Sequence, residues 1–317
     1  NATRMIDINV KSPEGFPRLN GPDNRHIYGD YSYYNDVSAF LLTNTNKGYG
    51  YIGSLSFNMQ PIEGLDIRGA YTHTVSKELT SLPGSNAQSA FTYIPTHEGP
   101  NNIELHNALN VTPDRYFLSV NYSDKCNNSF GLFYEAWRGG YNYSYTLTND
   151  INGDGYNYDS VYIPTDSEID QMKFKSDDDK ERFWAFVNSD PYLSKHKGEY
   201  AEPYSVYSPW VHRLDFRYTH DFKVKIGSSV NTLQLSVDIK NILNLFNSSW
   251  GVSKYGNPAF TDQRDSKMNI LSATIDDQGN AVYSTPSGVN GNVERWVYNH
   301  ALGQCWYAQI GIKYMFN

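Results

Sequence analysis

A strict two-residue alternation in the stretch 209–241 is the feature that most constrains how this chain folds. From Trp210 to Phe222, every second residue is aromatic, histidine or leucine, and the residues between them are mostly charged. After the turn sequence KIGSSVN, the residues from Thr232 to Lys240 alternate in the same way. A β-strand points successive side chains to opposite faces. The stretch therefore predicts two antiparallel strands, each apolar on one face and polar on the other.

The length of this alternation indicates where the hairpin lies. Strands of soluble proteins are usually about five or six residues long, whereas a strand that crosses a bilayer needs about nine to eleven. The first run continues from Trp210 to Lys223. A charged face of that length suits a water-filled lumen, and the apolar face then suits lipid. The alternative is a long hairpin in a soluble β-sandwich, with solvent on its charged side.

The same alternation recurs along the chain and predicts about eight strands in all, so we expect an all-β fold. Besides the hairpin above, the expected strands are Arg4–Val10, 49–57, 65–74, 116–122, 130–136 and 306–316. Short turns are expected near 59–64, 124–128 and 225–231, and long polar connections join the other strands. Outer-membrane barrels alternate short periplasmic turns with long extracellular loops. The pattern thus predicts a transmembrane antiparallel β-barrel segment.

Aromatic residues at the expected strand ends suggest the girdles of such a barrel. Three tryptophans fall where strands meet the long connections, and two phenylalanines fall at the opposite ends. The predicted aromatic girdle is Trp137, Trp210, Trp306, Phe222 and Phe316. The competing explanation is that aromatic residues simply favour strands, which accounts for their presence but not for their clustering at strand ends.

The inward parity of the last hairpins carries what we call the charged stripe. It consists of Arg213, Asp215, Arg217, Asp221, Asp238 and Lys240. Eight strands alone would close a barrel whose interior is filled by side chains, which leaves little room for so many charges. We therefore expect a segment of a wider barrel, although a complete eight-stranded barrel remains the alternative. Such stripes can line a path for solutes, but more often they pair across strands and hold a plug.

Composition excludes several classes of function. The formal net charge of -8 argues against nucleic-acid binding, which needs a basic surface. Only 39% of the residues are hydrophobic, and no apolar run has the length of a membrane-spanning helix. The two cysteines form neither a metal motif nor a disulfide framework. No Ser-His-Asp, HExxH, P-loop or GxGxxG signature is present, so we expect no enzyme activity and no required cofactor.

One loop contains the first half of a calcium-binding motif. Asp150, Asn152, Asp154 and Gly155 reproduce the D-x-N-x-D-G pattern, in which short oxygen-bearing side chains alternate and glycine allows a sharp turn. Position twelve is Val161 instead of glutamate, so Asp159 or Asp166 would have to substitute. The possible structural Ca²⁺ ligands are therefore Asp150, Asn152, Asp154 and Asp159. The alternative is a turn held by its own hydrogen bonds.

A helix is predicted over 176–188, in the longest of the polar connections. Ser176 suits its N-cap, three aspartates follow at its positive end, and Phe183, Trp184, Phe186 and Val187 give an apolar face. The helix could act as a lid or dock a partner, but packing the connections together is the expected role.

Four segments give the chain a resemblance to the C-terminal part of TonB-dependent outer-membrane transporters of the Oar-like and SusC-like kind. They are TNDINGDGYNYDSVYIP (148–164), ERFWAFVNSDPYLSKHKGEYAEPYSVYSPWVHRLDFRYTHDF (181–222), NTLQLSVDIKNILNLFNSSWGV (231–252) and QIGIKYMFN (309–317). The resemblance covers about half of the chain closely and the remainder in pattern, and these segments occur in the family's order. The resemblance implies that residues 1–317 belong to one barrel of about 22 strands. The family's plug domain and TonB box would lie outside this sequence.

The resemblance also implies function, location and partners. It implies TonB-dependent import of a sizeable solute (a glycan, a peptide or a chelate) across the outer membrane of a Gram-negative cell. The implied partners are the remainder of the barrel with its plug, the inner-membrane TonB complex, a surface lipoprotein lid, and lipid and lipopolysaccharide. The alternatives from other classes are a soluble or surface-exposed aromatic-rich β-sandwich that binds glycans with calcium, and a complete eight-stranded barrel.

Overall fold

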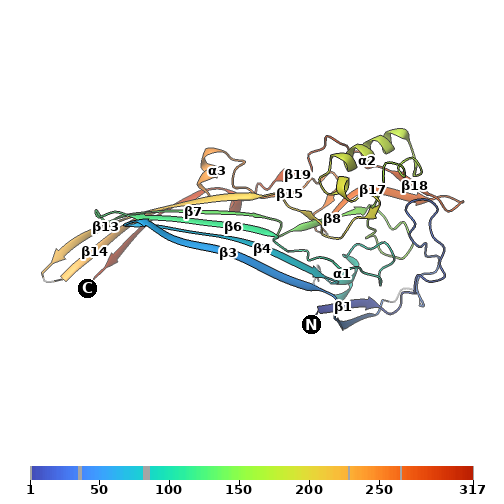
Figure 1. The fold of residues 1–317 in the computed structure, drawn as a ribbon, viewed down its shortest axis with the longest axis horizontal. Helices are drawn as coiled ribbons and strands as arrows, with labels where there is room; N and C mark the ends of the chain where they lie inside the picture. Colours follow the sequence, from blue (N-terminus) through green and yellow to red (C-terminus); the bar gives the residue numbers. More distant parts are fainter. Residues whose placement is uncertain (1, 35–37, 81–85, 228, 265, 317) are drawn as a thin grey trace.

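The structure is a computed structural model that describes residues 2–34, 38–80, 86–227, 229–264 and 266–316 (Figure 1). A long, twisted sheet forms one end of the molecule, and a more irregular region forms the other. No described helix combines the length and apolar character needed to cross a membrane, and the longest, α2 (Asp177–Ser189), has 13 residues.

The long sheet is an antiparallel meander in which neighbours in sequence are neighbours in space. Its seven long strands are β3 (Tyr49–Ile62), β4 (Leu65–Glu78), β6 (Asp114–Ser123), β7 (Asn128–Arg138), β13 (Val211–Ile226), β14 (Ser229–Lys240) and β20 (Tyr307–Met315). The short β5 (His106–Asn107) adds to the end of β4. The all-β, antiparallel expectation is confirmed, and seven of the expected strands form this one sheet. Among the described residues β3 and β20 are its two edges, so the sheet is open.

The first expected strand does not join this sheet. The predicted strand Arg4–Val10 appears as β1 (Ala2–Asp7), which pairs with β2 (Phe40–Thr45) in a separate two-stranded sheet. Its placement among eight consecutive strands was therefore wrong. The physical reason is burial, because Met5 packs into a small apolar cluster with Ala90 and Phe91.

The register of the ladders gives the sheet two different faces. Val237 lies opposite Tyr218 and Ile310, and Leu118 lies opposite Tyr134. These residues belong to what we call the apolar face, which extends over all seven strands. The alternate residues form the polar face, and they include the whole charged stripe. No described part of the chain covers much of the apolar face, because Leu55 is 78% exposed and Ile312 is 73% exposed.

Short and long connections lie at opposite ends of the sheet (Figure 1). The short connections are 63–64, 124–127 and the one through Gly227 that joins β13 to β14, each inside its predicted range. The long connections, 79–113, 139–210 and 241–306, all leave from the other end. Gly64 has a φ of +83° and sits so close to the Ser123 carbonyl that a Cβ would clash with it, so the first short turn requires glycine.

The long connections and the N-terminal segment fold together into a region that we call the cap, made of the described parts of 2–45, 79–113, 139–210 and 241–306. Its remaining elements are α1 (Ala87–Thr92), β8 (Asn142–Leu147), β9 (Tyr162–Ile163), β10 (Lys173–Phe174), η1 (Leu193–Lys195), β11 (Glu199–Tyr200), β12 (Val206–Tyr207), α3 (Ile242–Phe246), β15 (Lys254–Gly256), β16 (Thr261–Asp262), β17 (Lys267–Ile275), β18 (Ala281–Ser284), β19 (Trp296–Tyr298) and η2 (Leu302–Gln304). A six-stranded mixed sheet organises the cap, with β8–β17 and β10–β18 paired in parallel.

The hydrophobic core lies in the cap rather than in the long sheet. The largest buried cluster draws on β8, β17, β18 and α2, and it includes no residue of the seven long strands. Helix α2 forms as predicted, with Ser176 Oγ accepting from Asp179 N at 3.1 Å. Its residues Phe183 and Phe186 are fully buried. The helix therefore packs the connections together.

We predict that the cap core carries much of the stability. Phe186→Ala removes a fully buried ring that packs edge-to-face on Tyr145 and Phe260, so the free energy of unfolding should fall by about 3–5 kcal/mol. The matched control is Phe246→Ala in α3, because that ring is 73% exposed. Denaturant unfolding measures both, and equal effects would contradict a core in the cap.

Candidate functional site

The charged stripe forms ion pairs between neighbouring strands of the polar face. Arg217 lies directly opposite Asp238, and their side chains approach to 3.6 Å. Lys240 Nζ lies 2.8 Å from Asp215 Oδ2. Exposed pairs of this kind contribute little to stability, typically below about 1 kcal/mol. They fix the electrostatic pattern of the face more than they hold the sheet together.

The other two stripe residues have different partners. Asp221 accepts a hydrogen bond from Gln234 Nε2 at 2.8 Å. Arg213 donates to the Gly251 carbonyl at 3.2 Å and to Gln304 Oε1 at 2.6 Å. Both acceptors of Arg213 lie in the connection 241–306, so this residue ties the polar face to the cap.

A cavity of about 640 Å³, which we call the polar-face cavity, lies among these side chains. Five of the six stripe residues line it, all except Asp221, together with Glu135 and Cys305. Its charged lining is three cations, Arg213, Arg217 and Lys240, and three carboxylates, Glu135, Asp215 and Asp238. This balance suits a mixed-charge protein surface better than a solute of one charge sign. Glu135 was not singled out in the sequence. The side-chain alternation of the predicted strand 130–136 nevertheless places it on this face.

The predicted girdle residues divide between the two faces. Phe222 lies opposite Leu233 on the apolar face, and the Trp210 ring lies 5.6 Å from Tyr116 on that face. Phe316 stacks on Tyr314 and is 81% exposed, and Trp306 immediately precedes β20 and is also exposed.

Trp137 requires a correction. It lies opposite Arg115 and Val211, which places it on the polar face, and the guanidinium of Arg213 lies 5.4 Å from its ring centre. A side chain on the polar face cannot belong to one girdle with Trp210, which lies on the apolar face. The assignment followed strand ends and ignored parity, which pointed to the polar face.

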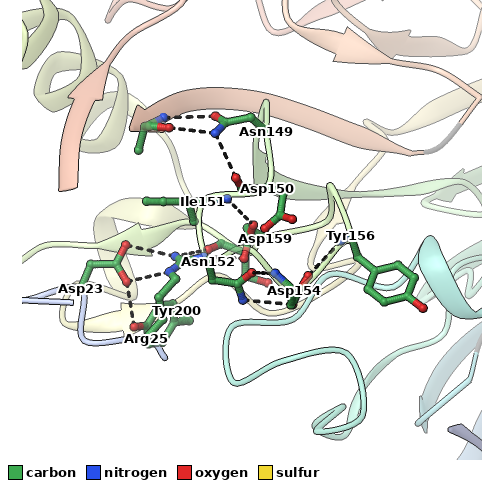
Figure 2. Close-up of polar contacts among 12 residues, drawn as sticks. Asp23, Arg25, Asn149, Asp150, Ile151, Asn152, Asp154, Tyr156, Asp159 and Tyr200 are labelled. Carbon is green, nitrogen blue, oxygen red and sulfur yellow. Dashed lines mark hydrogen bonds and ion pairs between the residues drawn. The ribbon is translucent and has the colours of Figure 1, made fainter. Parts of the chain in front are cut away.

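The aspartate-rich loop of the cap is closed by its own hydrogen bonds (Figure 2). The Asp150 carboxylate accepts from the backbone of Gly153 at 2.7 Å and of Gly155 at 2.9 Å. Both glycines have positive φ, as the sharp turn requires. Asn152 and Asp154 are buried and bind each other through side chains at 3.0 Å.

Arg25 connects this loop to the N-terminal segment (Figure 2). It is fully buried and forms ion pairs with Asp23 and Asp159, each at 2.9 Å. The hydroxyl groups of Tyr200 and Tyr283 donate to Asp23. Arg25 and Asp159 are separated by 134 positions, and nothing in the sequence around Arg25 indicated this contact.

The carboxylates buried around Arg25 outnumber this one cation, and the pKa values of several of them are raised. Burial, with the nearby charges of Asp159 and Asp150, raises the pKa of Asp154 well above its usual range. Burial also raises the pKa of Asp150. Burial raises the pKa of Asp159 to about 7, against the opposing guanidinium of Arg25.

Oxygen donors of this kind suit calcium, but the geometry supplies no ready cage. In the described parts of the chain, no group of three or more His, Cys, Asp or Glu residues is placed to hold a metal ion. The possible substitute Asp166 pairs with Lys197 at 2.6 Å instead of turning to the loop. Calcium at Asp150, Asn152, Asp154 and Asp159 therefore stays a prediction.

Comparisons with known proteins give no relative. No protein-family model matches the chain, and no curated protein or solved structure matches it either. The interpretation of the polar face and of the cap thus depends on residues and geometry. The resemblance to TonB-dependent transporters remains an expectation from the sequence.

We predict that stability falls as pH rises from about 4 to about 7. The pKa of Asp159 is raised from 3.8 to about 7, so the folded protein keeps a proton that the unfolded chain loses across this interval. The expected slope is up to about 1.4 kcal/mol per pH unit for this group. Asp159→Asn should flatten the curve of unfolding free energy against pH, whereas the exposed control Asp166→Asn should leave it unchanged. An unaltered slope in Asp159→Asn would contradict the assignment.

Proposed function

We propose that this chain forms part of the barrel wall and the outer cap of a TonB-dependent transporter that imports a sizeable solute across the outer membrane. The observation that carries the proposal is the long in-register sheet with one uncovered apolar face and one polar face. Strands β4 and β13 have 14 and 16 residues, beyond the roughly nine to eleven that cross a bilayer. Lipid and lipopolysaccharide are the natural partners of such an apolar face.

The uncovered face also weighs against the soluble β-sandwich. A sandwich buries the inner faces of its two sheets against each other. Here the mixed sheet of the cap packs its own core, and the apolar side chains of Leu55, Ile310 and Ile312 remain more than two-thirds exposed. An apolar surface of this extent in a soluble protein would favour aggregation.

Strand parity supports a larger barrel. Seven antiparallel strands leave the edge strands β3 and β20 running in the same direction, so direct closure would create a parallel pair. A head-to-tail ring of identical copies would meet the same obstacle at each junction, because β20 of one copy would run parallel to β3 of the next. An antiparallel barrel therefore needs an odd number of further strands between these edges. The eight-stranded alternative lacks its eighth strand among the described residues, because β1 pairs with β2.

The balanced charges of the polar-face cavity support a lumen that holds a plug. Arg217 with Asp238 and Lys240 with Asp215 give alternating signs to which a folded domain can be complementary. The inner-membrane TonB complex would act on that plug and supply the energy. The cap would face the outside, where a lipoprotein lid could cover it.

Labelling of cysteines in intact cells tests the proposed orientation. Cys126 is exposed in a short turn, and Lys195 is exposed in the cap. A bulky membrane-impermeant maleimide should label Lys195→Cys, made together with Cys126→Ser and Cys305→Ser, in intact cells. Cys126, studied in Cys305→Ser, should react only after lysis. Labelling of Cys126 in intact cells to the same extent as Lys195→Cys would refute the orientation.

The intact mass of the native detergent-solubilised particle tests the larger barrel. The proposal expects strands in the particle beyond those of this 36.1 kDa sequence, either in one longer polypeptide or in a second one. A folded, monomeric particle of 36.1 kDa alone would exclude the transporter and return the small-barrel alternative.

We also propose calcium as a structural ion of the aspartate-rich loop. Burial disfavours the charged forms of Asp150, Asp154 and Asp159 and raises their pKa values. A bound cation would stabilise these charged forms. Calcium should raise the melting temperature of the protein relative to a chelator, and Asp154→Asn should abolish the increase. An identical melting temperature with calcium and with chelator would remove the ion from the proposal.

A further inference from the structure

A second cavity lies at the junction where β7 and β13 leave the long sheet for the cap. This junction cavity has a volume of about 770 Å³, within the usual range for ligand pockets. Its main walls are Trp137, Tyr141, Tyr143, Lys254, Tyr255 and Gln263. None of these residues except Trp137 was singled out in the sequence.

The polar face provides the floor of this cavity. Trp137 on β7 lies opposite Val211 on β13, and both line the cavity. Gly139 and Gly140 follow with φ of +75° and +84°, which turns the chain from β7 into β8. A Cβ on Gly139 would lie 2.8 Å from Pro113 and 2.9 Å from the Val111 carbonyl, so this turn excludes other residues. The turn brings Tyr141 and Tyr143 into the wall.

The aromatic walls are held in position before any ligand binds. Tyr143 donates to Gln263 Oε1 at 2.7 Å, and Tyr141 donates to the Gln263 carbonyl at 2.5 Å. Trp296 packs edge-on against Tyr143 at 5.6 Å. The two phenol groups are thus engaged with Gln263. Tyr143 is almost fully buried, so Tyr141, which is 37% exposed, is the tyrosine of this pair that offers its ring surface to a ligand. A preorganised wall lowers the entropic cost of binding.

Lys254 gives this cavity a charge character that differs from that of the polar-face cavity. It is the one charged residue among the described residues of the lining. Its ammonium lies over the Tyr298 ring at 4.2 Å, and no described carboxylate forms an ion pair with it. A cation–π contact attracts the ammonium but supplies no negative charge to neutralise it. An anionic group on a ligand can therefore pair with Lys254 without displacing a carboxylate of the protein.

We propose that the junction cavity binds a solute that combines a flat face with a carboxylate. Aromatic side chains stack on flat ring or C–H surfaces, and an ammonium forms a charge-assisted hydrogen bond with a carboxylate. An acidic sugar and an aromatic acid share this chemistry. This inference rests on the proposed function, because it names the class of solute that the transporter would import. A solute that moves along the polar face would contact Trp137. Binding itself does not require transport.

Calorimetric titration of the full detergent-solubilised protein tests this inference. The probes are trigalacturonic acid and 2-naphthoic acid, with galactotriose and 2-naphthalenemethanol as their uncharged counterparts. At least one acid should bind, and its uncharged counterpart should bind about ten- to a hundredfold more weakly. The acid that binds identifies the solute as a sugar or an aromatic compound. Failure of both acids to bind, or equal binding of acid and counterpart, would overturn the proposal.

Variants separate the cavity from the rest of the surface. Lys254→Met should weaken binding of the acid by about ten- to a hundredfold and leave binding of the uncharged counterpart unchanged. Lys254→Arg should restore much of the affinity, and Trp137→Leu should weaken both ligands. The control Lys195→Met removes an exposed lysine of the cap and should change neither. Unchanged affinity in Lys254→Met, with native melting behaviour, would overturn the site even if cysteine labelling supports the transporter.

Discussion

The register of the antiparallel ladder is the constraint on which the rest of the structure depends. Neighbouring strands keep their register apart from one shift between Met59 and Ile62, beside the first short turn. Leu118, Val237 and Ile310 therefore belong to one face, and Arg217 and Asp238 belong to the other. A shift of one residue in any strand would exchange its two faces. Register therefore creates both the apolar surface that suits lipid and the polar surface that carries the two cavities.

Much of this sheet could be predicted from the sequence because side chains alternate between the two faces of a strand. That alternation stays the same when the predicted ends of the strand are misplaced by a few residues. The alternation in 209–241 fixed which side chains share a face without knowledge of the neighbours. The same reasoning failed where a strand was short. The six residues of β1 are too few for their alternation to identify a partner strand. The strand β2 was not predicted because it lies in a stretch rich in polar residues. Trp137 shows a different failure, since its parity was informative and its position near a strand end was given more weight.

Apart from α2, the cap could not be predicted because its core uses residues that do not look like core residues. All six residues of β8, NYSYTL, are buried, although four of them carry hydroxyl groups and one an amide. Hydrogen bonds compensate the burial of most of these polar groups, as where the Tyr145 hydroxyl donates to Asp190 at 2.7 Å, whereas Asn142 Oδ1 has no hydrogen-bond partner among the described residues. The ion pair of Arg25 with Asp159 spans 134 positions, and composition gives no information about such pairings. The polar connections were therefore interpreted as loops when they contain the largest buried cluster.

The parallel pairing of β8 with β17 has a consequence for the order in which the protein acquires its structure. Between these two strands the chain forms the whole β13–β14 hairpin, which belongs to the long sheet. The cap core therefore closes only after that hairpin has been synthesised. Contacts so distant in sequence form slowly. Until then, Phe186 of α2 lacks its packing partner Phe260, and partly folded chains that expose apolar side chains are prone to aggregation.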